Sequence, residues 1–591
     1  MRRIKIFWLS VLAVVLIVGG VVVADWWFAL PEGSTKSYVG SAKCAECHRQ
    51  EYDRWHGSDH DLAMDKATPE TVLGDFNDAT YTYHGITSKF FRRGDEYFVH
   101  TDGPDGKLAD FHVKYVFGVR PLQQYMVTFP DGRVQVLPFT WDVDQKRWYH
   151  MYQGSPHRQV ESEGQENAQP VRAGDWLHWT GAGQNWNYMC AECHSTNLRK
   201  NYDLAHDKYH TSFSEIDVSC ETCHGPGSMH VKLAEERFLF WDRRYGYGLP
   251  QLKGTSSLPQ LESCAPCHSR RHVVYPGFTS GERYMDHYSL SLLEENLYYP
   301  DGQILDEDYE YGSFLQSLMY RKGVRCTDCH DPHSARTRVA GNALCTRCHT
   351  QAKYDVESHH HHPAGSIGAQ CVECHLPARN YMVVDSRRDH SIRVPRPDIS
   401  LDLNTPNACA GCHIDKKKSD ELQSYPAWLD AAEEKNPVAV DEVHRVNQWS
   451  AEWIERWFPE SKHRGPHYAY TLAAARSGTL SFHGGTPEDP VQERAEILRR
   501  LIALSKDRLN VGPVVRATAV SHFEDYPSAA AREANDDALV DEEPMVRLAA
   551  VQNLDAFFPI RTTDLWTLPQ MQPQQRESMR RQFSELQQRA G

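Results

Sequence analysis

The chain has 591 residues and a formal net charge of −15, with 40% hydrophobic and 11% aromatic residues. A chain of this length forms more than one folded unit, and its composition is typical of globular proteins, which excludes general disorder. Because phosphate binding requires clustered Lys and Arg, the acidic balance argues against nucleic acid as a partner.

The N-terminal segment is the first predicted element. Basic residues in MRRIK precede an uncharged, apolar run of nineteen residues at 6–24, and the aromatic DWWF follows. A helix of this length nearly spans the hydrocarbon core of a bilayer, and aromatic side chains mark the membrane interface. We therefore expect residues 1–30 to form a signal anchor, a transmembrane helix that keeps the rest of the chain on the periplasmic side. The alternative is a cleaved signal peptide with a poor cleavage site at 22–24, which would leave the protein soluble or extracellular.

A β-rich insert is predicted over residues 79–152. Segments such as EYFVHTD and RVQVLPFTWDV are rich in β-branched and aromatic residues, and the turn signals GPDG at 103–106 and PDGR at 130–133 separate some of them. The insert lies between the first and second cysteine pairs of the chain. We expect it to fold as an antiparallel β unit.

All 16 cysteines fall into eight C-x-x-C pairs, and a histidine follows each pair directly. Numbered one to eight in chain order, the cysteine pairs are Cys44 and Cys47, Cys190 and Cys193, Cys220 and Cys223, Cys264 and Cys267, Cys326 and Cys329, Cys345 and Cys348, Cys371 and Cys374, and Cys409 and Cys412. The histidines that follow them are His48, His194, His224, His268, His330, His349, His375 and His413.

Three kinds of site use paired cysteines. Structural zinc needs four ligands, usually from two such pairs, and exported disulfides favour an even cysteine count, but neither requires a histidine directly after each pair. C-x-x-C-H is the attachment signature of haem c, in which the two thiols bind the haem vinyl groups and the histidine is the proximal iron ligand. We therefore predict eight covalently attached haems c.

The spacing of the motifs predicts an unusual interior. Motifs two to eight lie within residues 190–413, and only 19 to 62 residues separate their successive first cysteines. Segments this short cannot build an ordinary core, so we expect the porphyrins to supply much of it, wrapped by short helices and loops. Residues 31–430 are thus predicted to form a mainly α and irregular multihaem cytochrome c fold around the β-rich insert.

The C-terminal region differs from the motif-bearing region in its residue pattern. From about residue 440 the chain has no cysteine and reads as amphipathic helices, and PVVRATAV at 513–520 recurs as PMVRLAAV at 544–551. A proline at the helix start and an arginine in the same position favour an all-α domain of stacked, HEAT-like helical repeats over 440–591. The alternative is an ordinary helical domain. Because solenoids present contact surfaces, redox partner proteins are expected to dock there.

Four segments resemble a known family. HWTGAGQNWNYMCAECHSTN, VSCETCHGPGSMH, DEDYEYGSFLQSLMYRKGVRCTDCHDPH and RRDHSIRVPRPD are similar to exported multihaem (octahaem) cytochromes c with C-terminal helical repeats of HEAT or tetratricopeptide type. That family is distantly related to the cytochrome c nitrite reductase and hydroxylamine oxidoreductase group. The resemblance covers about 38–420.

The second axial ligand of each iron is also open to prediction. A six-coordinate haem c takes a distal His or Met, and the chain has 24 histidines outside the motifs against 12 methionines, so we expect bis-His ligation. The resemblance points to histidines just after or between the motifs: His60, His178, His230 and His333, followed by His287, His362 and His390. His362 closes the run HHHH at 359–362, which could instead trap a surface metal.

Two functions fit these features. The first is a relay that carries electrons between membrane or periplasmic donors and an acceptor. The second is a reductase of a small nitrogen or sulfur oxyanion such as nitrite, hydroxylamine or tetrathionate, with one haem open to substrate. Related nitrite reductases replace one motif histidine by lysine, whereas all eight motifs here keep histidine. This difference favours the relay.

Overall fold

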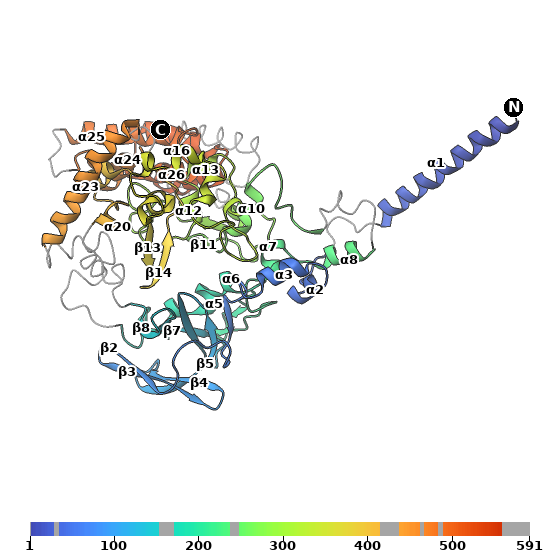
Figure 1. Ribbon diagram of the computed structural model, residues 1–591, viewed down its shortest axis with the longest axis horizontal. Helices are drawn as coiled ribbons and strands as arrows, with labels where there is room; N and C mark the ends of the chain where they lie inside the picture. Colours follow the sequence, from blue (N-terminus) through green and yellow to red (C-terminus); the bar gives the residue numbers. More distant parts are fainter. Residues whose placement is uncertain are drawn as a thin grey trace.

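The computed structural model describes residues 2–28, 35–152, 171–236, 248–413, 437–460, 466–482 and 489–557. In Figure 1 the N-terminal helix projects away from the rest, the strands within residues 79–150 lie at one end, and the C-terminal helices lie at the other. The segments that carry the cysteine motifs lie between these two ends. This arrangement places the predicted sites between a sheet and a helical layer.

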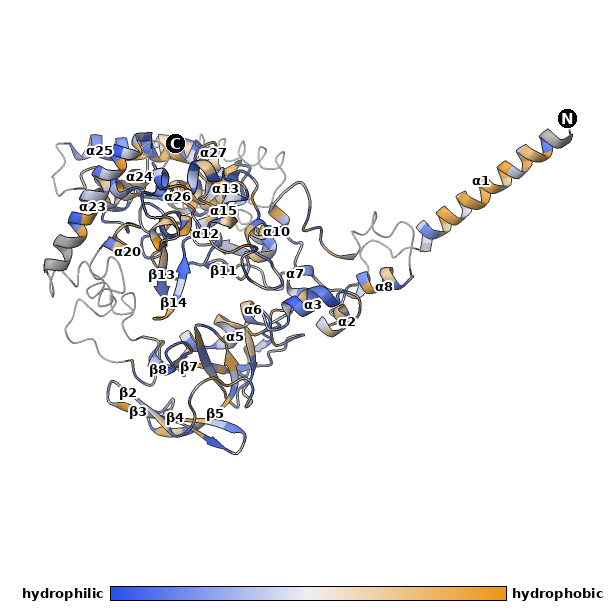
Figure 2. Ribbon diagram, in the orientation of Figure 1, coloured by the Kyte–Doolittle hydropathy of each residue, from blue (hydrophilic) through white to orange (hydrophobic). Residues whose placement is uncertain are grey.

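The N-terminal helix α1 (Arg2–Phe28) matches the predicted apolar segment. Its section Lys5–Trp27 has a mean hydropathy of 2.9 and is not buried by the part of the chain that the structure describes, and Figure 2 shows it coloured as hydrophobic along most of its length. Length and composition therefore suit a helix that crosses a membrane. A signal sequence has the same properties, so both alternatives for residues 1–30 agree with the structure.

The β-rich insert is an antiparallel sheet of eight strands in the order β2-β3-β4-β5-β6-β7-β8, with β1 paired to β5. The strands are β1 (Met64–Lys66), β2 (Ala79–Tyr83), β3 (Ile86–Arg93), β4 (Glu96–Asp102), β5 (Leu108–Phe117), β6 (Leu122–Thr128), β7 (Val134–Asp142) and β8 (Arg147–His150). The β-rich character predicted for 79–152 is confirmed, and within this sheet the sequence prediction missed only the short β1.

The sheet has a core on each side of its central strands. Phe76, Phe90 and Tyr125 belong to an aromatic cluster on one side, whereas Met126 and Trp186 belong to a second cluster on the other. For this reason β7 is buried along its whole length. Trp186 opens helix α5 (Trp186–Met189), which leads directly into motif two, so the sheet positions that motif.

Every cysteine motif lies in or beside a short helix. These helices are α2 (Ser41–Ala45), α6 (Ala191–His194), α7 (Cys220–His224), α10 (Leu258–Cys264), α14 (Cys326–Cys329), α15 (Ala343–Thr346), α18 (Cys371–His375) and α20 (Ala410–His413). In motif four, for example, the amide of His268 donates to the carbonyl of Cys264 at 3.1 Å. Residues three and four apart share one face of a helix, so a helical turn presents both thiols and the histidine on one side.

Short elements connect the motifs. Three two-stranded hairpins pair β9 (Tyr202–Asp203) with β10 (Lys208–Tyr209), β11 (Arg271–Val273) with β12 (Tyr288–Leu290), and β13 (Ala378–Tyr381) with β14 (Asp385–Arg388). The connecting helices are α3 (Arg49–Trp55), η1 (Ala182–Gln184), α8 (Ser228–Glu236), α11 (Tyr284–His287), α12 (Tyr311–Phe314), α13 (Leu318–Arg321), α16 (Gln351–Tyr354), α17 (Glu357–His360), η3 (Ile367–Ala369) and α19 (Pro397–Leu403).

The C-terminal region is helical, as predicted. Its elements are α23 (Pro437–Trp457), α24 (Ala469–Ser477), α25 (Pro490–Lys506), α26 (Pro513–Ser521), η5 (His522–Asp525), α27 (Ala529–Leu539), α28 (Pro544–Gln552) and α29 (Leu554–Phe557). The two copies of the predicted repeat are α26 and α28, which pack on each other. Their equivalent arginines, Arg516 and Arg547, are both buried and both bond Asp541. The HEAT assignment itself stays a prediction.

One hydrophobic core crosses the boundary predicted between residues 430 and 440. It joins Leu261, Tyr311 and Leu315 to the buried faces of α24 to α29. The amide of Leu293 donates to Thr518 Oγ1 at 3.0 Å, and the C-terminal helices lie against the α12–α13 region in Figure 1. The helices α24 to α29 therefore share their core with the region around motif four and with the segment between motifs four and five.

Candidate functional site

None of the sixteen cysteines forms a disulfide. The zinc alternative requires two cysteine pairs to converge on one point, and among the described residues no group of three or more His, Cys, Asp or Glu side chains gathers in that way. The motif histidines instead lie opposite histidines from outside the motifs.

Five motif histidines lie opposite a histidine from outside the motifs. The distances between ring centres are 6.1 Å for His48 and His230, 6.4 Å for His268 and His60, 6.3 Å for His330 and His390, 6.4 Å for His375 and His359, and 6.2 Å for His413 and His362. An imidazole nitrogen binds a metal at about 2.0 Å and lies roughly 1.15 Å from its ring centre, so two axial imidazoles on one metal put their ring centres about 6.3 Å apart. The residues therefore fit a haem iron held between each pair.

Four of the seven predicted distal histidines belong to these pairs: His60, His230, His362 and His390. Sequence reasoning did not single out His359, which lies opposite the histidine of motif seven with the two rings nearly parallel, at 8°. The signal was present in the histidine run 359–362, which contributes two members to the pairs. This geometry does not support the alternative that the run 359–362 binds a metal at the surface.

Two predicted distal histidines make other contacts. In His178, Nε2 lies 2.9 Å from Asp102 Oδ2 and Nδ1 lies 2.7 Å from Thr180 Oγ1. In His287, Nδ1 lies 3.0 Å from the carbonyl of Tyr275 and Nε2 lies 3.2 Å from Glu282. Neither ring has a nitrogen left for an iron in this arrangement, so the structure does not support the predictions for His178 and His287. The first of these contacts instead joins the segment before motif two to β4.

The remaining motif histidines have different neighbours. Burial lowers the pKa of His224, and the next largest contribution comes from the nearby His333, the seventh predicted distal ligand. The ring of His349 lies 5.9 Å from that of Tyr354. The ring of His194 lies 4.2 Å from that of Phe117, on β5. Motifs two and six thus show aromatic neighbours where the five pairs show imidazoles.

Hydrogen bonds hold several of the paired rings in position. His375 Nδ1 lies 2.8 Å from the carbonyl of Arg393, and His390 Nδ1 lies 2.9 Å from that of Arg388. His268 differs, because its Nδ1 lies 2.8 Å from the Glu310 carboxylate. Burial opposes ionisation of Glu310, whereas its hydrogen bond to His268 lowers the pKa of the carboxyl. Such bonds to Nδ1 leave Nε2 to face the metal.

Cysteines from different motifs also lie side by side. The thiols of Cys44 and Cys220 interact, which lowers the pKa of Cys44. Equivalent thiol contacts join motif two to four, four to five, and six to seven, and thiols of motifs three and four, five and six, and seven and eight lie near each other. All eight motifs therefore form one continuous series in the order one, three, four, five, six, seven, eight, with motif two beside motif four.

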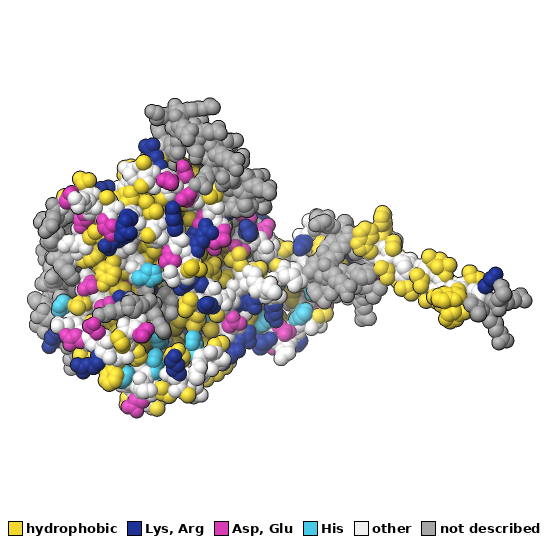
Figure 3. Space-filling model, turned by 90° about the horizontal axis from the view of Figure 1, so that it is seen from above, with side chains coloured by type: hydrophobic (Ala, Val, Ile, Leu, Met, Phe, Trp, Pro, Cys, Tyr) yellow, Lys and Arg dark blue, Asp and Glu magenta, His cyan; other side chains and the backbone are white. Residues whose placement is uncertain are grey.

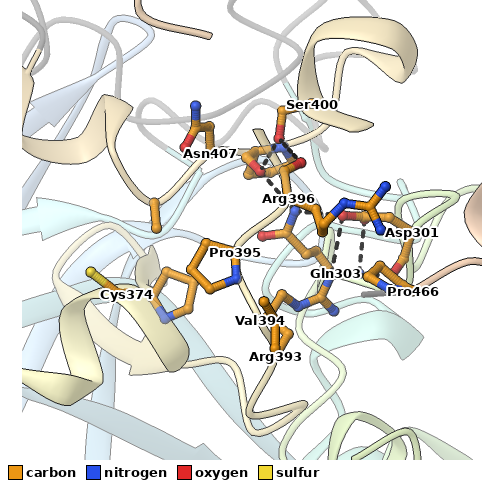
Figure 4. A pocket seen from close by; sticks show the side chains of 13 residues that line it. Asp301, Gln303, Cys374, Arg393, Val394, Pro395, Arg396, Ser400, Asn407 and Pro466 are labelled. Atoms are coloured by element: carbon orange, nitrogen blue, oxygen red, sulfur yellow. Dashed lines mark hydrogen bonds and ion pairs between the residues drawn. The ribbon is translucent and has the colours of Figure 1, made fainter. Parts of the chain in front are cut away.

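A pocket beside motif seven shows the surroundings of one attachment site (Figure 4). Cys374, Val394 and Pro395 line it together with two arginines. Arg393 is ion-paired with Asp301 at 3.1 Å, and Arg396 is ion-paired with Asp398 at 2.7 Å. Both guanidinium groups beside this motif are therefore already paired with carboxylates of the chain.

Comparisons with known proteins agree with these features. A family model described as "Doubled CXXCH motif" matches residues 320–354, and one described as "Cytochrome c554 and c-prime" matches residues 43–80 and 145–225. The "Multiheme cytochrome MtrA" of Shewanella baltica (strain OS185) is 23% identical over 239 residues, which cover 39% of this chain. The chain spans about half of that relative, 53% of its length.

A solved structure is also similar. "Crystal Structure of Outer Cell Wall Cytochrome OcwA" aligns with a TM-score of 0.44 and 17% identity, covering 88% of this chain and 99% of that chain. The family-model matches contain five of the eight C-x-x-C-H motifs. Together, the matched segments and the motifs make the chain similar to multihaem cytochromes c.

Proposed function

We propose that the chain relays electrons through eight covalently attached haems c, most of which have two axial histidines. The observation that carries this proposal is the set of five histidine pairs with ring centres 6.1 to 6.4 Å apart. Each pair joins one motif histidine to one histidine outside the motifs. An iron with both axial positions filled by protein has no place for a substrate, which is what a relay requires.

Each haem supplies an iron that takes up and releases one electron. The chain's own residues attach the porphyrin through two thioethers, hold the iron between two imidazoles and exclude other ligands. Bis-His ligation favours a lower potential than His/Met ligation. The continuous series of thiol contacts supports close spacing of successive haems, and hence passage of electrons from motif one toward motif eight or in reverse.

The partners are redox proteins whose identity the relay alone does not specify. On the face in Figure 3, acidic and basic side chains are interspersed and histidines reach the surface. The net charge of −15, to which haem propionates would add, favours docking to basic surfaces, and salt would weaken that docking. We further propose that α1 anchors the protein on the periplasmic side of a membrane and that partners dock on the C-terminal helices.

The haem count gives the first test. Acid–acetone extraction should leave the haem on the polypeptide, and the intact mass should exceed the sequence mass by eight haems. Viologen should reduce all of them quickly, without sustained turnover of nitrite, hydroxylamine, tetrathionate or sulfite. A clearly smaller haem ratio contradicts the octahaem proposal, and turnover of any one substrate contradicts the pure relay.

A second candidate function is the reductase, and motif two favours it. The ring of His194 has Phe117 as its close aromatic neighbour, and Tyr309 lies near Cys190 and Cys193 of this motif. The guanidinium of Arg387 lies 5.6 Å from the ring centre of Tyr309. A phenol and a guanidinium beside an iron could donate a proton to a small oxyanion and bind its charge.

Spectroscopy separates the two functions. A reductase centred on motif two predicts one high-spin ferric haem, whose signal changes on addition of nitrite or sulfite and in the variant Tyr309→Phe. A relay with every iron six-coordinate predicts neither change. The replacement removes only the phenolic oxygen, so the haem content serves as the control for correct assembly.

A further inference from the structure

The histidine of motif four differs from other paired histidines in its hydrogen-bond partner. His268 Nδ1 lies 2.8 Å from the Oε2 atom of Glu310, a carboxylate. His390, which lies opposite the histidine of motif five, and His375 of motif seven each have a backbone carbonyl oxygen as partner, at 2.9 and 2.8 Å. A carbonyl is neutral, whereas an ionised carboxylate is charged, and charge-assisted hydrogen bonds are about twice as strong as neutral ones.

The fold holds this carboxylate in place from both sides. Glu310 directly precedes α12, and its carbonyl accepts from the amide of Phe314 at 2.8 Å. The amide of Tyr311 donates to the carbonyl of His268, also at 2.8 Å. Tyr311 and Phe314 are buried in the core that joins motif four to the C-terminal helices. Because two adjacent residues of this rigid segment bond one histidine, the Glu310 side chain is fixed relative to the imidazole.

Motif four also occupies a junction. The thiol of Cys267 interacts with Cys193 of motif two, the thiol of Cys264 interacts with Cys326 of motif five, and Cys223 of motif three acts on both. Electrons that pass from motifs one and three, or from motif two, toward motifs five to eight therefore meet at this centre. A difference in its redox potential affects every such path.

We propose that Glu310 is a positioning residue that lowers the redox potential of the haem at motif four below that of the haems at motifs five and seven. A carboxylate that accepts from Nδ1–H gives the imidazole more anionic character, and an anionic ligand stabilises ferric over ferrous iron. The inference rests on the proposed relay. If so, the haem at motif four separates the haems of motifs one to three from those of motifs five to eight. During reduction, the haems on both sides of it are reduced before it is.

The test is a spectroscopic redox titration of the full-length holoprotein and of Glu310→Gln. Glutamine keeps the length of the side chain and a neutral oxygen acceptor for Nδ1–H. We expect about one-eighth of the total absorbance change, the share of one haem, to move from the low-potential end of the titration to higher potential. The electron paramagnetic resonance g-values of one low-spin haem should change as well.

A matched control separates the hydrogen bond from simple loss of charge. Glu373 lies within motif seven and pairs with Arg388 at 2.6 Å, not with a histidine. Glu373→Gln removes the same charge beside a haem and should leave both the titration and the g-values nearly unchanged. Equal shifts in the two variants, or none in Glu310→Gln, would overturn the proposal.

The number of low-spin haems in the wild type shows whether a failed test contradicts the relay or only the role of Glu310. Eight low-spin haems in the wild type with an unmoved titration in Glu310→Gln contradict only the role of Glu310. Fewer than five low-spin haems in the wild type contradict the relay itself. If Glu310→Gln fails to incorporate its haems, Glu310→Asp replaces it, because aspartate keeps the charge but draws the carboxylate back by one methylene. We then expect a smaller shift in the same direction, and an unmoved titration overturns the proposal.

Discussion

The eight-stranded sheet and the motif-bearing segments are stabilised in different ways. The sheet has an aromatic core of its own, in which Phe90 and Tyr125 are 1% and 0% exposed. Around the motifs, the helices are short and each cysteine is half-buried or exposed within the polypeptide. A sheet of this kind is specified by the alternation of its own residues, whereas the motif region needs the porphyrins to complete its interior. The predictions below test that difference, beginning with the largest effect.

The largest effect should follow from production of the chain without haem attachment. We expect the motif segments to lose their fixed structure while the sheet, which buries its own apolar surface, keeps its fold. Limited proteolysis followed by mass spectrometry should then yield a resistant fragment close to residues 64–150, with cleavage concentrated after residue 190. Equal resistance of both regions would show that the motif segments fold without haem.

Replacement of single histidines should affect the haem spectra in the motif-bearing region but not beside the sheet. His390→Ala removes one member of a pair on motif five and should convert one haem from low-spin to high-spin. His178→Ala removes the contacts with Asp102 and Thr180 and should leave every haem spectrum unchanged. Because a buried charged partner is left unsatisfied, His178→Ala should instead lower the free energy of unfolding by about 1–3 kcal/mol. A high-spin signal in His178→Ala would show that His178 is a distal ligand.

A tight backbone contact tests the core that crosses the predicted boundary at residue 440. A Cβ atom on Gly512 would lie 1.9 Å from the carbonyl oxygen of Leu315. Gly512→Ala should therefore push the C-terminal helices away from the motif region and lower the free energy of unfolding by about 1–3 kcal/mol or more. Gly254→Ala is the control, because nothing lies within 4 Å of its added Cβ atom. An unchanged melting temperature in Gly512→Ala would argue for two independent domains.

The smallest effect concerns an ion pair that joins α3 to motif five. Arg54 Nη1 lies 2.8 Å from Asp331 Oδ2, and the arginine side chain is 41% exposed. Exposed ion pairs contribute about 0.2–1 kcal/mol. Arg54→Ala should lower the free energy of unfolding by no more than this at low salt, and the difference should shrink at high salt. A larger loss would indicate that this contact positions motif five.

The difference between the sheet and the motif-bearing segments also explains which features could be predicted from the sequence. The strands from β2 to β8 follow from local alternation and turn residues, but β1 has three residues and is a strand only because it pairs with β5. The C-x-x-C-H motifs identify the haem attachment sites directly. The partners of the motif histidines do not follow from spacing, since His60 and His268 lie more than two hundred residues apart. Likewise, nothing in the sequence near His178 reveals that Asp102 binds its ring.

The most direct test of the account is a quantitative electron paramagnetic resonance spectrum of the oxidised full-length protein, normalised to haem content by mass. The account predicts eight haems per chain, with at least five of them giving low-spin signals typical of two axial imidazoles. Those five correspond to the histidine pairs on motifs one, four, five, seven and eight. A spectrum in which fewer than five haems are low-spin would contradict the assignment of these pairs as iron ligands, and with it the proposed relay.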